Sequence, residues 1–384
     1  MVAFSKCSRI TSEKAFHPWS SSSSYVALEV FSSIFRRSFK MYGSLYLFAA
    51  FLRRKNWEYF KKELLPEILQ STTFLSINGG LFVALICLFR KILGVLTYPT
   101  SCFIPAAIAS YSAILVERPQ RRGLLALYTF NNAIEAVFNA LVQNNIIKKV
   151  PYGEVYIFCC ATGLLMYLYR KNKLNNGFLR SIVRFLLNEK ANGDSNGPSN
   201  NHLVIDYKNI YRRLLAPFKA FSLGYLVEVL PRILKSISMP RKIPTHLLDK
   251  SNFYLGFFLG SFVSTFQLIE FLMTVIRRKR DSLNSLMAGA ASGLSLLFYR
   301  SSTISLYLLT KVLEIVLKNG QLEGYIPFLP HVDVIVYTIS TATIFHMCFL
   351  HPLSVRPSYW KFICHVTNDK VIPGSKMLPK IFKT

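Results

Sequence analysis

The sequence predicts an all-α integral membrane protein made of two tandem four-helix halves related by internal duplication. Hydrophobic residues account for 52% of the 384 residues and charged residues for only 17%, whereas soluble domains contain about 25% charged residues. Apolar runs of helical length recur along the chain, as expected for helices that cross a bilayer. Matched polar residues recur at one offset in the two halves, which indicates an internal repeat.

Eight apolar runs are predicted membrane spans, because a bilayer core about 30 Å thick needs roughly 20 apolar residues per helix. They are Ile68–Phe89, Phe103–Val116, Gly123–Val142, Val155–Tyr169, Phe253–Ile276, Leu283–Phe298, Thr303–Leu317 and Val334–Leu350. Several have only 14–17 residues, so flanking side chains or local bilayer thinning must make up the length. Two runs of 11–12 residues, Met41–Leu52 and Ala220–Leu230, precede the halves and are predicted to be interfacial or re-entrant helices.

Loop charge predicts the orientation of these spans. The chain carries 46 Lys and Arg against 19 Asp and Glu, a net charge of +27. With eight spans, both termini and the centre share one side. That side holds 36 of the basic residues and the other side holds 9, which predicts that the termini and centre are cytosolic. Because the charges flank the spans and form no single face, we expect no nucleic-acid partner.

Composition divides the chain nearly in half. The run Ala191–Asn201 is rich in Gly, Asn and Ser and is predicted to be a flexible linker. The predicted organisation is an N-terminal segment (1–39), a first membrane repeat (40–190), the linker (191–201), a second membrane repeat (202–370) and a C-terminal tail (371–384). We expect no secretory signal and no cleaved presequence, although residues 1–40 have a weakly presequence-like composition.

The two halves align at an offset of 179 residues, or 180 in places. Among the matches are Arg121, Tyr128 and Glu135 with Arg300, Tyr307 and Glu314, and Pro151 and Glu154 with Pro330 and Asp333. Chance alignment of two apolar sequences does not readily match polar residues at one offset. Four spans per half would make the repeats parallel, whereas five spans, with the two shorter runs included, would make them inverted.

A polar stripe is the candidate functional feature of the membrane region. Arg121, Tyr128 and Glu135 are spaced by seven residues, so they share one face of the third predicted span. The second half repeats the stripe as Arg300, Tyr307 and Glu314, with Lys311 one turn before the glutamate. A carboxylate within a span costs about 2.5–3.5 kcal/mol on insertion scales, so each needs water or a partner. The stripe is either a polar path or headgroup site, or a structural tie between helices.

Small residues and basic clusters have more general roles. Three pairs of small residues, each pair spaced by four, are predicted to pack helices closely. They are Ser76 and Gly80, Gly256 and Gly260, and Gly289 and Gly293. Basic clusters at the span ends (53–55, 118–122, 170–173 and 277–280) are predicted to set topology and to contact anionic lipid headgroups.

No motif for catalysis or cofactor binding is visible. The sequence has no Walker A loop, no GxSxG and no HExxH. The seven cysteines form no CxxC pair, which is unlike a disulfide framework or a zinc site. His346, Cys348 and His351 lack further ligands for a tetrahedral metal. We therefore expect a protein that is not an enzyme and has no cofactor or metal.

Five segments carry a resemblance to the transmembrane protein 135 family, also called peroxisomal membrane protein 52. They are LLPEILQS (64–71), RKILG (90–94), ERPQRRGLLALY (117–128), FYRSSTISLYLLTKVLE (298–314) and RPSYWKF (356–362). Residues 281–293 also resemble the Tim17/Tim22/Tim23 and peroxisomal membrane protein 24 superfamily, whose four-span units pack on glycines. One departure is that only Cys7 remains in residues 1–60, where family members can be cysteine-rich.

The resemblance implies a multi-pass protein of mitochondrial or peroxisomal membranes. It implies regulation of mitochondrial fission and dynamics, and of peroxisomal or lipid homeostasis, including cholesterol and fatty acids. The expected partners are the lipid bilayer, its anionic headgroups and the mitochondrial division machinery, and oligomerisation stays open. One alternative is a lipid or small-molecule conduit that uses the glutamate stripes. Another, by superfamily analogy alone, is a protein translocase component.

Overall fold

The structure, a computed structural model, describes residues 7–174, 177–187, 207–236, 249–279 and 281–382. The predicted linker 191–201 lies outside the described residues. The described chain is helical apart from short connections and one antiparallel ladder, in which β1 (Cys7–Ser8) pairs with β2 (Leu96–Thr97). It divides into two compact units, which we call unit 1 (Met1–Lys149 with Leu329–Thr384) and unit 2 (Val150–Phe328).

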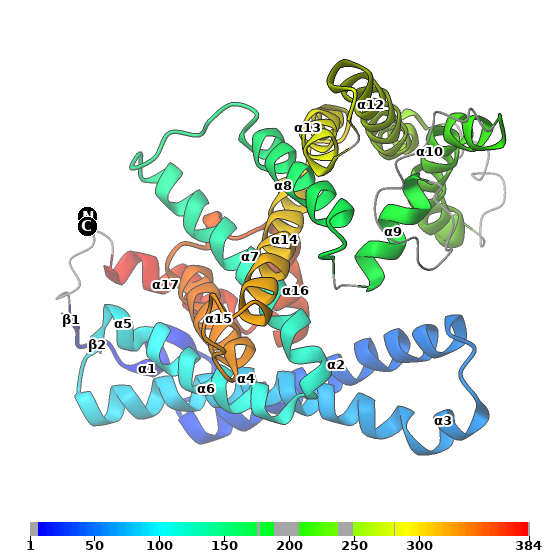
Figure 1. The fold of residues 1–384 in the computed structure, drawn as a ribbon. Helices are drawn as coiled ribbons and strands as arrows, with labels where there is room; N and C mark the ends of the chain where they lie inside the picture. The colour runs from blue at the N-terminus through cyan, green and yellow to red at the C-terminus, as the bar shows by residue number, and fades with distance from the viewer. Residues whose placement is uncertain (1–6, 175–176, 188–206, 237–248, 280, 383–384) are drawn as a thin grey trace. The chain divides into compact units, whose positions relative to one another are not determined.

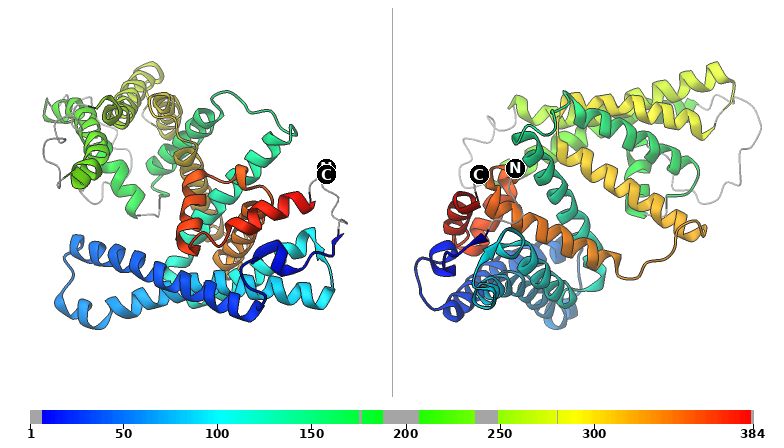
Figure 2. Two further views of the ribbon diagram at one scale, coloured as in Figure 1. Left: turned by 180° about the vertical axis from the view of Figure 1, so that it is seen from behind. Right: turned by 90° about the vertical axis from the view of Figure 1, so that its left-hand side faces the viewer.

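Unit 1 is built on an antiparallel pair of long helices that remain side by side in all views (Figures 1 and 2). Its helices are α1 (Ser12–Phe16), α2 (Ser23–Leu52), α3 (Trp57–Lys62), α4 (Leu64–Leu93), α5 (Tyr98–Ser101), α6 (Phe103–Val116), α7 (Pro119–Gln143), α15 (Val332–Leu350), η4 (Pro352–Ser354), α16 (Pro357–Thr367) and α17 (Ile372–Phe382). α15 packs on α6 and α7. Aromatic rings fill the core, where Phe82 of α4 lies 4.9 and 5.4 Å from Phe345 and Phe349 of α15, between ring centroids.

Small residues explain how closely α2 and α4 approach. A Cβ atom added at Gly80 would lie 2.8 Å from the Cβ of Phe31, which is closer than a side chain tolerates. Ser22 caps the start of α2 by accepting a hydrogen bond from Tyr25. α4 ends at Gly94, whose φ of +68° suits glycine. The two helices therefore have defined ends and a close seam.

Unit 2 has the same arrangement of helices. It contains α8 (Gly153–Arg170), α9 (Gly177–Leu187), α10 (Tyr207–Ser236), η2 (Lys250–Asn252), α12 (Phe253–Arg277), α13 (Ser282–Ser292), η3 (Gly293–Phe298) and α14 (Ser302–Leu322). α10 pairs with α12, and α8 packs on α13 and α14. At the α10–α12 seam, a Cβ at Gly256 would lie 3.0 Å from the carbonyl oxygen of Phe221.

The closing helices of the two predicted repeats are exchanged between the units. The offset of 179 residues places α8 and α15 at equivalent positions in the repeats, since it carries Gly153 onto Val332. Yet α8 packs on α13 and α14 within unit 2, while α15 packs on α6 and α7 within unit 1. The helices that follow them are exchanged too: α9 contacts α10 within unit 2, and α16 contacts α2 within unit 1. Each unit combines the leading helices of one repeat with the closing helices of the other.

Four helices of the described chain are long and apolar enough to cross a membrane: Leu64–Leu93, Leu214–Ile233, Lys250–Arg277 and Val332–Leu350. Phe103–Val116 and Ser282–Phe298 are shorter apolar helices. All eight predicted spans are helical. α7, α8 and α14 belong to neither group, and the crossing of every predicted span stays a prediction. Polar side chains such as Arg122, Asn131 and Glu135 lower the hydropathy of α7.

The two runs predicted to be interfacial or re-entrant helices belong to longer helices, and their interfacial position stays a prediction. The run Met41–Leu52 is the last part of the 30-residue α2, and Ala220–Leu230 lies within the 30-residue α10. The segment Leu214–Ile233 of α10 is itself long and apolar enough to span. The predicted run stopped at Lys219 and Pro231, but the helix continues through both positions.

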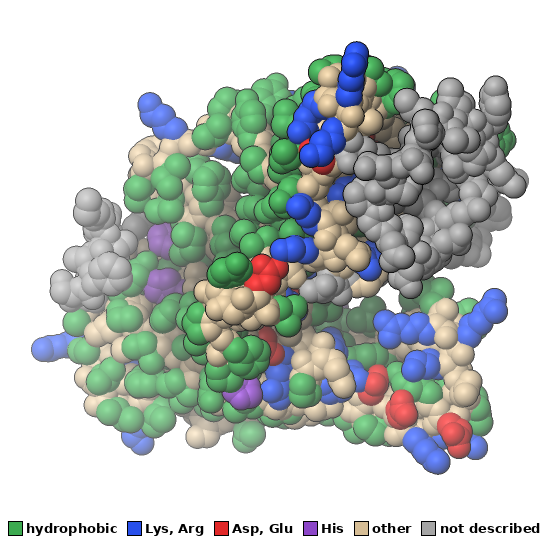
Figure 3. All heavy atoms as spheres, in the orientation of Figure 1, with side chains coloured by type: hydrophobic (Ala, Val, Ile, Leu, Met, Phe, Trp, Pro, Cys, Tyr) green, Lys and Arg blue, Asp and Glu red, His purple; other side chains and the backbone are tan. Residues whose placement is uncertain are grey.

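Surface chemistry in unit 1 changes along the α2–α4 pair. Hydrophobic side chains cover much of the face over α4 and α6 (Figure 3). Lys, Arg, Asp and Glu gather at the end that carries α3. This distribution agrees with an all-α membrane protein in which the charged end lies outside the apolar layer.

Candidate functional site

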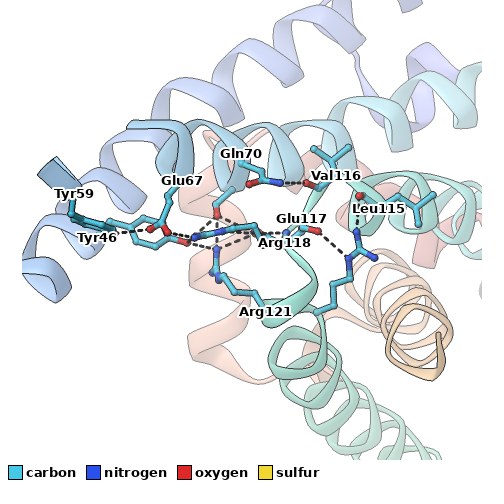
Figure 4. A network of polar contacts seen from close by, with 11 residues as sticks. Tyr46, Tyr59, Glu67, Gln70, Leu115, Val116, Glu117, Arg118 and Arg121 are labelled. Carbon is cyan, nitrogen blue, oxygen red and sulfur yellow. Dashed lines mark hydrogen bonds and ion pairs between the residues drawn. The ribbon is translucent and has the colours of Figure 1, made fainter. Parts of the chain in front are cut away.

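The most buried charge among the described residues stands where α6 turns into α7. The side chain of Glu117 is 0% exposed. It accepts hydrogen bonds from the backbone N–H of Arg118 at 3.1 Å and from Ser71 Oγ at 3.3 Å. Arg121 Nη1 lies 3.2 Å from its second oxygen. Glu117 is therefore the centre of a polar network that joins α4 to the start of α7 (Figure 4).

Two arginines extend this network to α2 and α3. Arg118 Nη2 donates to Tyr46 Oη at 2.7 Å, and Arg121 also hydrogen-bonds Tyr46. Both guanidinium groups lie about 5.4–5.5 Å from the Tyr46 ring centroid, within the range of cation–π attraction. Arg118 also forms an ion pair with Glu67. Each of these arginines thus has more than one acceptor.

Tyr59 closes the outer end of the network. Its hydroxyl donates to Glu67 Oε2 at 2.6 Å. Burial, followed by this hydrogen bond to a carboxylate, raises the pKa of Tyr59 to about 12. Tyr59 belongs to α3, which precedes the apolar span of α4. Because its pKa lies well above physiological pH, the hydroxyl of Tyr59 stays protonated and donates.

The sequence around the turn explains why the network forms there. Pro119 occupies the first turn of α7, where its missing N–H costs nothing. α6 ends at Val116 and leaves carbonyl oxygens without helical partners. Arg122 donates to Leu115 O and Gln70 donates to Val116 O, both at 2.8 Å. Side chains of the turn and of α4 therefore donate hydrogen bonds to the free carbonyl oxygens at the end of α6.

The structure gives the three stripe residues of the first half different surroundings. Arg121 belongs to the network around Glu117. Tyr128 is half exposed, with its ring 6.2 Å from that of Tyr359 between centroids. Glu135 forms an ion pair with Arg356, whose Nε donates to Oε1 at 3.2 Å. Within unit 1 the glutamate has the partner that its place in a predicted span requires.

The second half's stripe is arranged differently. The Arg300 guanidinium lies 4.2 Å from the centroid of the Tyr152 ring. Tyr307 is partly exposed. Glu314 accepts from Lys311 Nζ at 2.7 Å and from Lys318 Nζ at 2.6 Å. This carboxylate is paired along its own helix, whereas Glu135 is paired across helices.

One buried pair was missed by sequence reasoning. Glu270 of α12 is buried, and Arg170 of α8 holds it through Nη2 at 2.8 and 3.0 Å. Ser285 of α13 donates to the same carboxylate at 2.8 Å. A glutamate inside the predicted span Phe253–Ile276 is the signal that could have found it, because such a residue needs a partner.

The predicted packing glycines lie at close helix contacts. A Cβ at Gly289 would lie 2.8 Å from Thr162 O, and one at Gly293 would lie 2.6 Å from the Cα of Cys159. Gly260 lies against Phe221. Ser76 is fully buried and donates to Thr72 O at 2.7 Å. α13 and η3 could not approach α8 this closely with larger side chains at these positions.

Among the residues that the structure describes, no group of three His, Cys, Asp or Glu side chains could hold a metal ion. His346 instead packs edge-on against the Tyr98 ring, with centroids 4.6 Å apart. Cys348 is buried in the apolar core of unit 1.

Residues 11–142 match the family model for the N-terminal cysteine-rich region of transmembrane protein 135. This segment contains α1 to α7, apart from the end of the last, and the whole network around Glu117. No solved structure matches the chain. The match covers about a third of the chain and shows that this part is similar to that region of transmembrane protein 135.

Proposed function

We propose that this protein is a multi-pass regulator of organelle membranes, acting in mitochondrial fission and dynamics and in peroxisomal or lipid homeostasis. The observation that carries the proposal is the match of residues 11–142 to a region of transmembrane protein 135. The segments 298–314 and 356–362 extend the resemblance into the second half. The proposed location is the mitochondrial or peroxisomal membrane, with the mitochondrial division machinery as a partner.

The pairing of four carboxylates favours a scaffold over a conduit. A conduit needs polar groups that are available to water or to a passing solute. Glu117, Glu135, Glu270 and Glu314 each have an Arg or Lys partner within their own unit. Removing such a partner would leave a charge in a medium of low dielectric constant. We therefore assign structural roles to these pairs: Glu117, Glu135 and Glu270 are tied to other helices, and Glu314 is paired along α14. We place the regulatory contacts outside them.

The experiment compares two readouts on the same protein. A null cell line is complemented with the full chain, and mitochondrial and peroxisomal shape and number are measured with the tagged protein imaged beside organelle markers. Purified protein in liposomes is tested in parallel for movement of fluorescent sterol, fatty acid and phospholipid. Restored organelle shape without flux supports the proposal. Flux that accounts for the cellular phenotype, or a tagged protein absent from both organelles, contradicts it.

A further inference from the structure

A cavity of about 510 Å³ lies in unit 1, where the start of α2 meets the end of α4. α1 forms its third side. The cavity is lined by four hydroxyl side chains and two cations: Thr11, Ser12, Ser23, Ser24, Arg90 and Lys91. None of the described residues that line it is acidic. The proposed regulatory role does not use this cavity.

Contacts at both ends of α1 fix the shape of the cavity. Before α1, Arg90 donates through Nε to Ile10 O at 2.7 Å and through Nη2 to Arg9 O at 2.6 Å. After α1, His17 is buried, and its Nδ1 donates to Ser20 O at 2.8 Å. Because a carbonyl oxygen only accepts, Nε2 is left as the acceptor for the Cys87 thiol at 3.5 Å. α4 therefore holds this segment from two positions.

The donors around the cavity suit an oxyanion. Lys91 is exposed and follows Arg90 directly on α4. Ser23 and Ser24 form the first turn of a 30-residue helix. Their backbone N–H groups belong to the four that have no acceptor within the helix, and the helix dipole adds positive potential there. A phosphate monoester, with a charge of about −1.5 to −2, complements two cations, hydroxyls and amides.

The location indicates how such a phosphate could be presented. The cavity lies at the end of a helix that is apolar enough to span a membrane, which is the depth at which headgroups meet hydrocarbon. Ala27 and Ala84 line its apolar side, and Leu88, also a lining residue, is 49% exposed. Acyl chains attached to the phosphate could therefore lie along α4. A free phosphate could reach the same donors from water.

We propose that this cavity binds a phosphate-bearing ligand through Lys91, Arg90 and the start of α2. The same chemistry could come from the headgroup of an anionic phospholipid or from a soluble phosphate. The inference depends on the membrane character of the chain and not on its role in organelle dynamics. A loss of that role would therefore leave it unaffected.

The experiment measures lipid binding to the full chain in detergent by native mass spectrometry. The probes are phosphatidic acid and diacylglycerol with the same acyl chains, so that they differ only in the phosphate. Lys91→Gln and the pair Ser23→Ala, Ser24→Ala remove donors, whereas Arg90 is left intact because it holds residues 9 and 10. The control is Lys148→Gln, which removes an exposed charge after α7, remote in sequence from the cavity.

Phosphatidic acid should bind the native chain better than diacylglycerol does. Loss of one charge-assisted hydrogen bond should weaken its binding about tenfold in Lys91→Gln, with no change in Lys148→Gln. Inorganic phosphate added as competitor separates the sources. Binding that it leaves unchanged supports a lipid headgroup, and displacement that depends on Lys91 supports a soluble phosphate. Equal binding of the two lipids, or equal losses in Lys91→Gln and Lys148→Gln, would overturn the proposal.

Discussion

Replacing Glu117 by Gln should destabilise unit 1 more than any exposed glutamate replacement in that unit. The change keeps the shape of the side chain and removes its charge. Arg118 and Arg121 would then remain in the network with one fewer anion, since both contact the Glu117 carboxylate. Tyr46 and Glu67 would still serve them as acceptors.

The expected magnitude follows from burial. Breaking a fully buried ion pair by removing one partner costs about 3–5 kcal/mol. Glu117 is 0% exposed, but the Arg121 side chain is 25% exposed, so water and the other acceptors offset part of that cost. We expect a loss of about 2–3 kcal/mol in the free energy of unfolding, below the fully buried case. The control is Glu58→Gln, whose side chain is 85% exposed and lies 3.8 Å from Lys62. Such a pair contributes at most about 1 kcal/mol.

The assay is equilibrium unfolding of the purified chain in mixed micelles by titration with a denaturing detergent. A double-mutant cycle with Arg121→Gln isolates the pair, and its coupling energy should lie between about 0.5 and 3 kcal/mol. Equal stability of Glu117→Gln and Glu58→Gln would refute the reasoning. So would a coupling energy indistinguishable from zero.

Three further outcomes are expected. Gly293→Ala should lower stability by about 1–3 kcal/mol in the same assay, because the added Cβ meets the Cα of Cys159; Gly123→Ala, with open space around it, should not. Fragments 1–201 and 202–384, co-expressed, should copurify as a folded complex because their closing helices are exchanged; two fragments that are each stable alone would contradict this. Single cysteines at Asn201→Cys and Lys250→Cys, in a background without the native cysteines, should be labelled from opposite sides of the membrane if α10 crosses it. Labelling of both cysteines from the same side would indicate that α10 lies at the membrane interface and does not cross.

Helix positions could be predicted from the sequence because hydropathy is a local property. All eight predicted spans fall on helices of the structure. The length of α10 could not be predicted in the same way. Lys219 and Pro231 interrupt the apolar run, and only packing against α12 shows that the helix continues through them. In α10, packing against α12 outweighs the local tendency of Pro231 to end a helix.

Interaction partners that lie far apart in the chain could not be predicted from the sequence. The stripe identified Glu135 as a carboxylate that needs a partner, but nothing local indicates Arg356, 221 residues later. The glycines 289 and 293 indicate a close helix contact without saying that α8 supplies it. The duplication aligns α8 with α15 but carries no information about which unit each joins. The exchange of closing helices therefore required the structure.

The central claim is that the paired carboxylates Glu135 and Glu314 have a structural role and do not form a conduit. The measurement is rescue of a null cell line by the variant Glu135→Gln, Glu314→Gln, expressed at the abundance of the native chain and imaged in the same organelles. Gln retains the shape and hydrogen-bonding capacity of each side chain, and interhelical polar contacts in membranes average only about 0.6 kcal/mol. The account predicts organelle shape and lipid content equal to those restored by the native chain. Failure to rescue at normal abundance and correct location would contradict it and would favour a polar path.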